Sequence, residues 1–281
     1  MKVLVTGATG FIGNHVVKEL LKNNYQVIAT SANEKKARKF SWFDNVKYIA
    51  FNLIEFNSNF NYYNLFEQPD IIIHLAWEGL PNYNSLFHIE ENLFRHYIFL
   101  KNLVSNGAED ITVTGTCFEY GLQEGELSED FPSLPANSYA IAKDSLRKFL
   151  EQLQKQSFFI LKWARLFYIY GEGQNPNALL SQLGKAIANN EKQFNMSEGN
   201  QKRDYLPVEK VAEYLVKIAM QKKVEGIINC CSGKPITVNE IVNNFLKEKN
   251  KTITLNKGVY PYSQYEPLHF WGDADKLSRI I

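Results

Sequence analysis

Short runs of consecutive apolar residues alternate with longer segments of helical periodicity over the first two-thirds of the chain. The runs are almost continuously apolar, which is typical of parallel strands that helices cover on both faces. Six strands are predicted, at residues 3–6, 27–31, 46–51, 71–75, 111–114 and 159–164. Three helices are predicted between them, at 13–23, about 86–105 and about 138–156. This alternation predicts an α/β fold in which right-handed βαβ units form a doubly wound parallel sheet of Rossmann type.

The alternation of apolar strands and periodic helices becomes less regular after Gly171, and Asn175-Pro176-Asn177 indicates a turn there. Further helices are predicted at 178–189, 208–217 and 238–247. We therefore expect a main domain over residues 1–170 and a smaller C-terminal lobe over 171–281. Some strands and helices of the second segment are expected to return to the main domain.

Composition removes several classes of function. The 281 residues include 31 Lys+Arg and 30 Asp+Glu, so a net charge of +1 gives no general attraction to nucleic acid or an acidic membrane. No apolar run approaches the roughly 20 residues needed to span a bilayer. Neither the three cysteines nor the five histidines show metal-ligand spacing, so no metal is expected. We expect a soluble, cytoplasmic protein with reduced thiols.

A glycine-rich turn joins the first predicted strand to the first helix. Its sequence is Gly7-Ala8-Thr9-Gly10-Phe11-Ile12-Gly13, with the spacing G-x-x-G-x-x-G. The glycines permit a tight turn, a close approach of the backbone to a pyrophosphate, and close helix–strand packing. The alternative is a tight turn without a ligand, but the position after a strand favours dinucleotide binding by residues 1–170. The predicted contacts are Gly7, Thr9, Gly10, Phe11, Ile12 and Gly13.

The end of the second strand indicates which dinucleotide is bound. Enzymes that bind NAD usually place an acidic residue there for the ribose 2′-hydroxyl, whereas this chain has Thr30-Ser31-Ala32-Asn33. Lys35, Lys36 and Arg38 follow, and they either meet a 2′-phosphate or form a solvated helix face. The missing carboxylate favours NADP(H), with NAD(H) left open, and the predicted contacts here are Ser31, Asn33 and Lys35.

Tyr139 and Lys143 carry the candidate chemistry. They stand at i and i+4 on a predicted helix and so share one face. We expect the ammonium to favour the phenolate and make Tyr139 a proton donor and acceptor nearer neutral pH. Thr114 and Thr116 lie at the carboxyl end of the fifth strand, where open α/β sheets bind ligands. Taken alone, Tyr139 and Lys143 could be an exposed pair on a helix, and Thr114 and Thr116 could be ordinary residues at the end of a strand.

Taken together, these motifs resemble the extended short-chain dehydrogenases/reductases of the nucleotide-sugar epimerase/dehydratase superfamily. The resemblance covers nearly the whole chain, although each motif alone is weak. The further matching segments are Asn52-Leu53, His74-Leu75-Ala76, Asn92, Thr116 with Tyr120-Gly121, Arg165-Leu166-Phe167, Tyr170-Gly171 and residues 203–208.

The resemblance implies a role for each matching residue. Tyr139 would be the catalytic acid/base, Thr116 its hydroxyl partner, and Lys143 would bind the nicotinamide ribose and tune Tyr139. Arg203 would face the diphosphate of a nucleotide-sugar, unless it is a structural ion pair. The fourth and fifth helices would form the interface of a homodimer. The other implied cofactor contacts are Asn52, Leu53, Leu75, Ala76 and Thr114, and the other substrate contacts are Tyr83, Cys117 and Asn175.

Departures from the family pattern narrow the implied reaction. In 4,6-dehydratases, Asp and Glu follow the catalytic threonine, but here Cys117 and Phe118 do, so dehydration is not expected. Residues 77–83 and 114–121 are similar to those of bacterial nucleotide-4-keto-6-deoxysugar reductases, which implies a role in deoxysugar and polysaccharide (O-antigen) biosynthesis. The implied reaction is NADPH-dependent reduction at C4 of a nucleotide-linked 4-keto-6-deoxyhexose such as dTDP-4-dehydro-6-deoxyglucose. The alternatives are a C4 epimerase that retains NAD and a catalytically silent dinucleotide-binding regulator.

Overall fold

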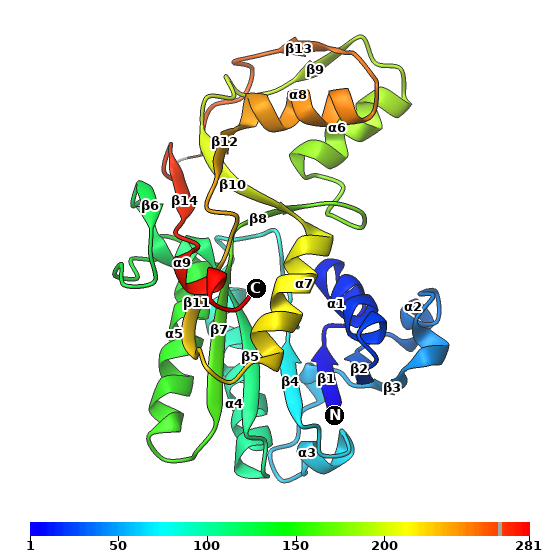
Figure 1. Ribbon diagram of the computed structural model, residues 1–281, viewed down its shortest axis with the longest axis vertical. Helices are drawn as coiled ribbons and strands as arrows, with labels where there is room; N and C mark the ends of the chain where they lie inside the picture. The colour runs from blue at the N-terminus through cyan, green and yellow to red at the C-terminus, as the bar shows by residue number, and fades with distance from the viewer. Residues whose placement is uncertain (264–265) are drawn as a thin grey trace.

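A sheet of seven parallel strands forms the centre of the computed structural model, which describes residues 1–263 and 266–281 (Figure 1). The strand order β11-β7-β5-β4-β1-β2-β3 reverses direction between β1 and β4, as in a doubly wound fold. The predicted Rossmann-type architecture is thus confirmed. The strands are β1 (Lys2–Thr6), β2 (Gln26–Ser31), β3 (Lys47–Ala50), β4 (Ile71–His74), β5 (Asp110–Thr116), β7 (Ile160–Leu166) and β11 (Gly226–Cys230).

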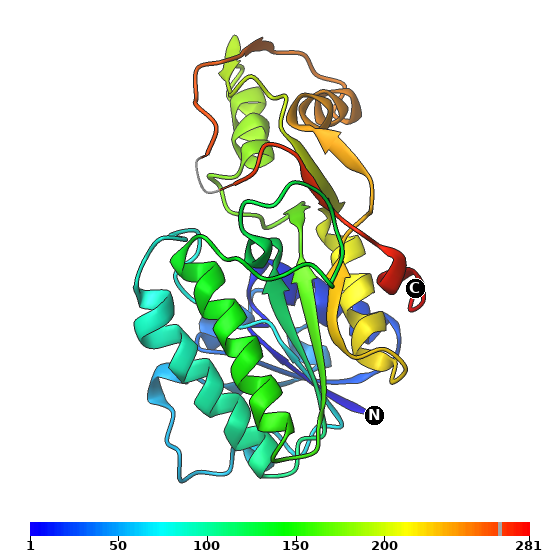
Figure 2. The same cartoon turned by 90° about the vertical axis from the view of Figure 1, so that its left-hand side faces the viewer.

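Helices cover both faces of this sheet, which explains why its strands are apolar on both sides. One face packs against α1 (Phe11–Lys22) and α7 (Val208–Met220), and the other against α4 (Leu93–Ser105) and α5 (Ser138–Gln154). Figure 2 shows α4 and α5 lying side by side on their face. The remaining short helices of this part are α2 (Glu34–Ala37), α3 (Tyr62–Leu65) and α9 (Asp275–Ser278).

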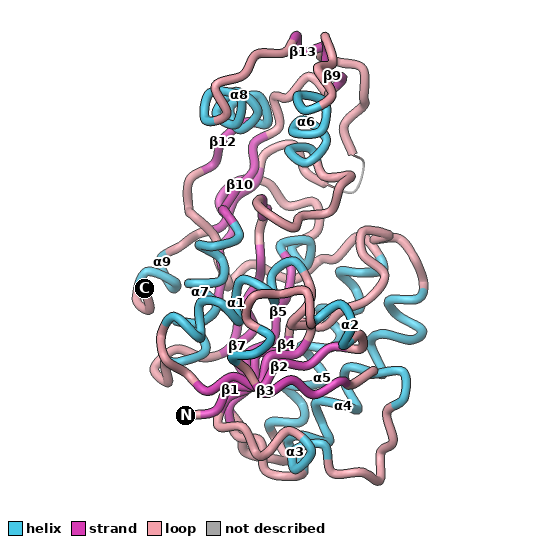
Figure 3. Tube along the Cα trace, turned by 90° about the vertical axis from the view of Figure 1, so that its right-hand side faces the viewer, coloured by secondary structure: helices cyan, strands magenta, loops and turns pink. Residues whose placement is uncertain are grey.

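A second, smaller group of elements lies beyond the carboxyl ends of the main strands (Figure 3). Its own core includes Leu183, Phe194 and Val242. Among the described residues after 171, α7 and β11 belong to the main sheet and its cover, whereas the other elements form this lobe or return from it. The elements of this group are β8 (Tyr168–Tyr170), α6 (Leu179–Ala188), β9 (Gln193–Asn195), β10 (Lys202–Pro207), β12 (Pro235–Thr237), α8 (Val238–Glu248) and β13 (Thr254–Asn256).

The chain returns from the lobe to the main domain near its end. There β14 (Phe270–Gly272) pairs in parallel with β6 (Gly125–Leu127), which lies beyond the carboxyl end of β5. The periodicity predicts neither strand, because both are short and are stabilised by a partner far away in the sequence.

The long predicted helix at 86–105 differs from the structure in its first turns. Residues His88–Asn92 form a π-helical turn, and the regular helix α4 begins only at Leu93. A π-helical turn inside a helix is frequent at functional sites. Here it places His88 and Asn92 in buried positions.

Within the described part of the chain, no helix is long and apolar enough to cross a membrane. The same residues hold no group of three or more His, Cys, Asp or Glu side chains that could bind a metal ion. Cys117, Cys230 and Cys231 are all free and buried.

Candidate active site

The turn after β1 is a backbone cradle in which Gly7 and Gly13 leave no room for a Cβ. Gly7 has a φ of +68°, and its carbonyl oxygen accepts a 2.9 Å hydrogen bond from the Gly10 N–H. A Cβ on Gly13 would overlap that same oxygen and lie 2.9 Å from Ala8 Cα. No side chain caps the first turn of α1. Free N–H groups at a helix N-terminus bind phosphate, so the cradle fits the pyrophosphate of a dinucleotide.

A pocket of about 450 Å³ lies next to the end of β2, where the adenosine ribose of such a dinucleotide would lie. Lys35 lines it without an ion-pair partner among the described residues, whereas Arg38 is bonded to the Glu34 carboxylate. Asn33 also lines it and accepts a hydrogen bond from a backbone N–H of α2. The Ser31 hydroxyl is bonded to the Tyr48 hydroxyl at 2.9 Å. Of the three predicted residues, Asn33 and Lys35 line the pocket and Ser31 does not, and the acidic side chain of Glu34 lines it as well.

The other predicted cofactor residues are distributed around the same edge of the sheet. Asn52 caps a short 3₁₀ turn, Leu53–Glu55. Leu75 and Ala76 donate their N–H groups to Thr6 Oγ1 at 3.2 and 3.3 Å. At the start of α1, Thr9 is buried, and Phe11 and Ile12 are half-buried.

The three predicted catalytic residues come together where β5 ends and α5 begins. Asn137 caps α5 by accepting a 2.9 Å bond from the Ala140 N–H, which fixes the helix start. Tyr139 and Thr116 are 8% and 6% exposed, and a side-chain hydrogen bond joins them. Tyr139 and Lys143 lie on one face of α5, as their spacing predicts. The arrangement can deliver a proton to an oxygen atom bound beside Tyr139.

Lys143 is the most deeply buried member of this group, at 1% exposure. Its ammonium donates a 2.9 Å hydrogen bond to the Thr114 carbonyl and lies 4.1 Å from the centre of the Trp77 ring. Burial lowers the pKa of Lys143 to about 7, and the charge of Glu119 opposes this shift. The lysine therefore changes charge close to neutral pH.

Replacing Lys143 by methionine is expected to stabilise the protein most at low pH. Below pH 7 the folded wild-type protein buries Lys143 in its charged form, which is unfavourable. Between pH 7 and about 10 Lys143 is neutral in the folded protein but charged in the unfolded chain. The folded state then binds fewer protons, so the stability of the wild-type protein rises with pH over this range. The Tm difference between Lys143→Met and wild type should thus be largest near pH 6 and shrink towards pH 9. The control is Lys155→Met at the exposed C-cap of the same helix, and an equal Tm difference at both pH values would contradict the buried-charge account.

The expected acidic phenol is not what the structure shows. Burial raises the pKa of Tyr139 above its ordinary value, and Tyr83 and Glu119 raise it further. The Lys143 ammonium donates its hydrogen bond to the Thr114 carbonyl, and burial is the largest influence on the pKa of Tyr139. That prediction was wrong because the i, i+4 spacing places the two groups on one face but does not reveal how deeply both are buried.

Sequence reasoning assigned no individual role to Trp77, His88 or His96, which form an aromatic cluster beside Tyr139. The indole of Trp77 donates a 3.2 Å bond to His88 Nδ1 and stacks on the His96 ring at 4.6 Å between centres. The Tyr139 ring lies 5.4 Å from His88 and 6.0 Å from Trp77. Burial lowers the pKa of both histidines. The available signal was the position of Trp77, three residues after the buried strand β4.

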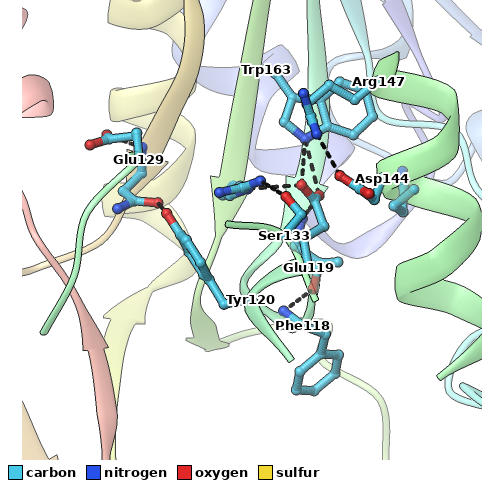
Figure 4. A network of polar contacts seen from close by, with 12 residues as sticks. Phe118, Glu119, Tyr120, Glu129, Ser133, Asp144, Arg147 and Trp163 are labelled. Atoms are coloured by element: carbon cyan, nitrogen blue, oxygen red, sulfur yellow. Dashed lines mark hydrogen bonds and ion pairs between the residues drawn. The ribbon is translucent and has the colours of Figure 1, made fainter. Parts of the chain in front are cut away.

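A second buried polar group is centred on Glu119, which lies close to Trp163 and Ser133 (Figure 4). The Glu119 carboxylate accepts hydrogen bonds from the Thr116 N–H at 2.8 Å and from the Trp163 indole at 3.0 and 3.1 Å. Arg165 Nε donates to it at 2.8 Å, and Arg165 Nη2 donates to the Ser133 hydroxyl at 2.6 Å. The resemblance covers Arg165 and the segment 114–121 that contains Glu119, but it does not reveal that the two residues form an ion pair.

Two predicted substrate residues lie next to Tyr139. The carbonyl of Tyr83 accepts the Tyr139 N–H at 2.9 Å, and the two rings are 5.7 Å apart. Tyr83 also lines a pocket of about 290 Å³ formed by residues 81–85. Cys117 is 4% exposed, and burial raises the pKa of its thiol.

The other two predicted substrate residues are engaged elsewhere. Asn175 is in the loop before α6, where its side chain accepts a 2.8 Å bond from the Asn177 N–H. Arg203 on β10 is 5% exposed and donates to Glu266 at 3.0 Å and to the Tyr168 hydroxyl at 3.1 Å. Its remaining nitrogen donates to backbone carbonyls. The structure thus shows Arg203 as an ion pair within the lobe, and its role towards a diphosphate remains a prediction.

Comparison with known proteins places these features in context. A family model described as "NAD dependent epimerase/dehydratase family" matches residues 3–231. A dTDP-6-deoxy-L-talose 4-dehydrogenase (NAD(+)) of Aggregatibacter actinomycetemcomitans is 29% identical, with 97% of this chain and 99% of that protein covered. A dTDP-4-dehydro-6-deoxyglucose reductase of Escherichia coli is 25% identical, with 89% and 82% covered.

Solved structures share the same fold. The UDP-glucuronic acid 4-epimerase of Bacillus cereus, in complex with UDP-glucuronic acid and NAD, superposes with a TM-score of 0.83 at 22% identity, covering 100% of this chain and 92% of that one. At this level of identity the likeness extends to the fold alone.

Proposed function

Because the chain belongs to the NAD-dependent epimerase/dehydratase family, we propose that it is a ketoreductase acting at C4 of a nucleotide-linked 4-keto-6-deoxyhexose. The proposed substrate is dTDP-4-dehydro-6-deoxyglucose, and the product is a dTDP-6-deoxyhexose such as dTDP-fucose. Two relatives support this choice, since the names of both describe redox chemistry at C4 of a dTDP-linked 6-deoxyhexose.

One observation carries the proposal: the proton-transfer group Thr116–Tyr139–Lys143 is complete, while the next two residues after Thr116 carry no carboxylate. Cys117 cannot replace an acid, because burial raises the pKa of its thiol. Phe118 packs its ring against Tyr83 at 5.2 Å and against Tyr168 at 6.3 Å. The site therefore suits reduction of a carbonyl better than elimination of water.

The chain's own residues would bind and protonate the substrate. The dinucleotide, when bound in the glycine cradle, supplies the hydride for sugar C4. Tyr139 donates its phenolic proton to the C4 oxygen, and Thr116 holds that oxygen through its hydroxyl. Lys143 in its charged form stabilises the phenolate that remains. The raised pKa of Tyr139 makes it a proton donor in its resting state.

Purified protein incubated with dTDP-4-dehydro-6-deoxyglucose and NADPH or NADH tests the proposal. We expect stoichiometric loss of the reduced-nicotinamide absorbance and formation of a 6-deoxyhexose nucleotide. Tightly bound NAD with C4 epimerisation and no consumption of added cofactor would instead support the epimerase, which the same three residues could serve. Cofactor binding without turnover of any keto-sugar would support the silent regulator.

We further propose NADPH as the preferred reductant, supported by the absence of a carboxylate on residues 30–33 and by Lys35 at the adenosine pocket. Lys35→Ala is expected to raise the Kd for NADPH about tenfold and to change that for NADH much less, because only NADPH carries the 2′-phosphate. Lys36, which does not line the pocket, provides the matched control Lys36→Ala. Equal weakening of both cofactors by Lys35→Ala, measured by fluorescence titration, would contradict the assignment.

The proposed homodimer would use the outer face of α4 and α5. Phe94 and Ile98 lie one turn apart on α4 and are 53% and 41% exposed, and Ile141 on α5 is 39% exposed. Contiguous exposed apolar side chains mark interaction surfaces. The double substitution Phe94→Asp/Ile98→Asp should convert dimer to monomer in sedimentation experiments, whereas Phe158→Asp, at an exposed position outside this face, should not. A wild-type monomer would refute the proposal.

A further inference from the structure

Glu119 is a fully buried carboxylate that sits between the catalytic strand end and the sheet core. It is 0% exposed and belongs to the 3₁₀ turn Cys117–Tyr120 that follows Thr116. Its side chain folds back to accept the Thr116 N–H at 2.8 Å, while Thr116 Oγ1 accepts the Phe118 N–H at 3.3 Å. The two side chains thus close the turn reciprocally and fix the backbone at Thr116.

The carboxylate itself is held from the neighbouring strand β7. Trp163 and Arg165 are two positions apart on β7 and so lie on the same face of the strand. Trp163 donates to the Glu119 carboxylate through its indole N–H and Arg165 through its guanidinium Nε. Gly115 leaves the space for this contact, because a Cβ there would overlap both the Glu119 carboxylate and the Trp163 indole nitrogen. Because the buried Glu119 carboxylate binds the Arg165 guanidinium and two neutral N–H donors at once, its orientation is fixed. The position of Thr116 is therefore set by β7 through Glu119.

The network also reaches the segment that leads into α5, where Ser133 lies beside Glu119 (Figure 4). The backbone N–H of Leu134 donates to the Glu119 carbonyl at 2.9 Å, and Arg165 binds the adjacent Ser133. Glu119 is thus bonded to β5, β7 and the segment that leads into α5, which carries Tyr139. Its charge also acts on the pKa values of Tyr139 and Lys143.

We propose that Glu119 is a positioning residue for the C4 reduction, holding the Thr116 backbone so that the threonine hydroxyl stays in reach of Tyr139 and the substrate oxygen. This inference rests on the proposed function and adds to it a residue that touches neither substrate nor dinucleotide. Arg165 and Trp163 act through Glu119 by fixing its carboxylate.

A double-mutant cycle tests the proposal with the full-length protein, dTDP-4-dehydro-6-deoxyglucose and the reduced cofactor. Glu119→Gln is expected to lower kcat about 10- to 100-fold, with KM for the nucleotide-sugar and Kd for the dinucleotide nearly unchanged, since small misplacements of a catalytic group have effects of this size. In a Thr116→Ala background, Glu119→Gln should have little further effect on kcat, because the group that it positions is gone. Purely additive losses in kcat would overturn the proposal and leave the proposed function standing.

The cycle also separates the failure of the proposal from that of the function. Full activity of Thr116→Ala would overturn the role given to Glu119, because the group that it positions would not be needed, whereas a wild-type protein that turns over no keto-sugar would overturn the proposed function. Asp110→Asn is the matched structural control, because Asp110 begins the same strand β5 and forms a buried ion pair with Lys162 at 2.8 Å. It should lower Tm without a change in kcat at a temperature where it is folded. If Glu119→Gln does not fold, Glu119→Asp keeps the charge opposite Arg165 and shortens the reach to Thr116, and the same cycle and criteria apply.

Discussion

Tyr139→Phe is expected to lower kcat by about 10²- to 10⁴-fold, because it removes the group that transfers a proton to the substrate oxygen. The ring remains, so its contacts with Tyr83, His88 and Trp77 persist. The Kd for the dinucleotide should therefore change by less than about twofold. Stopped-flow measurement of cofactor oxidation, combined with a binding titration, provides both values.

Tyr120→Phe is the matched control for this change. Tyr120 is also fully buried, and its hydroxyl donates to Asn229 Oδ1 at 2.8 Å (Figure 4). Its loss leaves a buried acceptor without a donor, so we expect a cost of about 1–3 kcal/mol in the free energy of unfolding but no comparable fall in kcat. Similar falls in kcat for the two variants would indicate that Tyr139 has a structural role.

Gly13→Ala is expected to have the second large effect, on cofactor binding and stability together. The added Cβ overlaps the Gly7 carbonyl oxygen, and the atoms that would have to move are backbone atoms of the cradle itself. Overpacking typically costs about 1–3 kcal/mol, and the displaced turn should raise the Kd for the dinucleotide by at least about tenfold. Thermal denaturation and a cofactor titration measure the two effects.

Gly184→Ala is the matched control, because a Cβ added at this glycine does not clash with any neighbouring atom. Gly184 lies inside α6, and its added Cβ would make an ordinary 3.6 Å contact with Phe245. Alanine is the better helix former by about 1 kcal/mol, so this variant should be as stable as wild type or more stable. Normal cofactor affinity in Gly13→Ala would contradict the assignment of the cradle.

The sequence predicts the features of this fold that depend on local pattern. Strand β4 begins with three consecutive isoleucines, all of them buried. The spacing G-x-x-G-x-x-G can be interpreted from the strand and the helix that flank it. The same holds for Asn137, Tyr139 and Lys143, which share one short stretch of α5. Each of these signals lies within about one turn or one strand of chain.

The sequence does not predict features that depend on distant partners. The local sequence around Glu119 does not indicate its role, because its partners Trp163 and Arg165 lie on β7, 44 and 46 positions later in the chain. The Arg203–Glu266 pair and the pairing of β6 with β14 join still more distant segments. The pKa of Tyr139 belongs to this class too, since burial is decided by the whole fold.

The three buried cysteines have a practical consequence. Each thiol is at most 4% exposed, and burial raises the pKa of all three. A labelling reagent needs access to a thiolate. The three thiols can therefore react only when the structure around them opens. Cys117 lies beside the catalytic turn, whereas Cys230 and Cys231 lie at the end of the edge strand β11. The wild-type chain thus carries intrinsic chemical reporters of opening at two places, with no engineered label required.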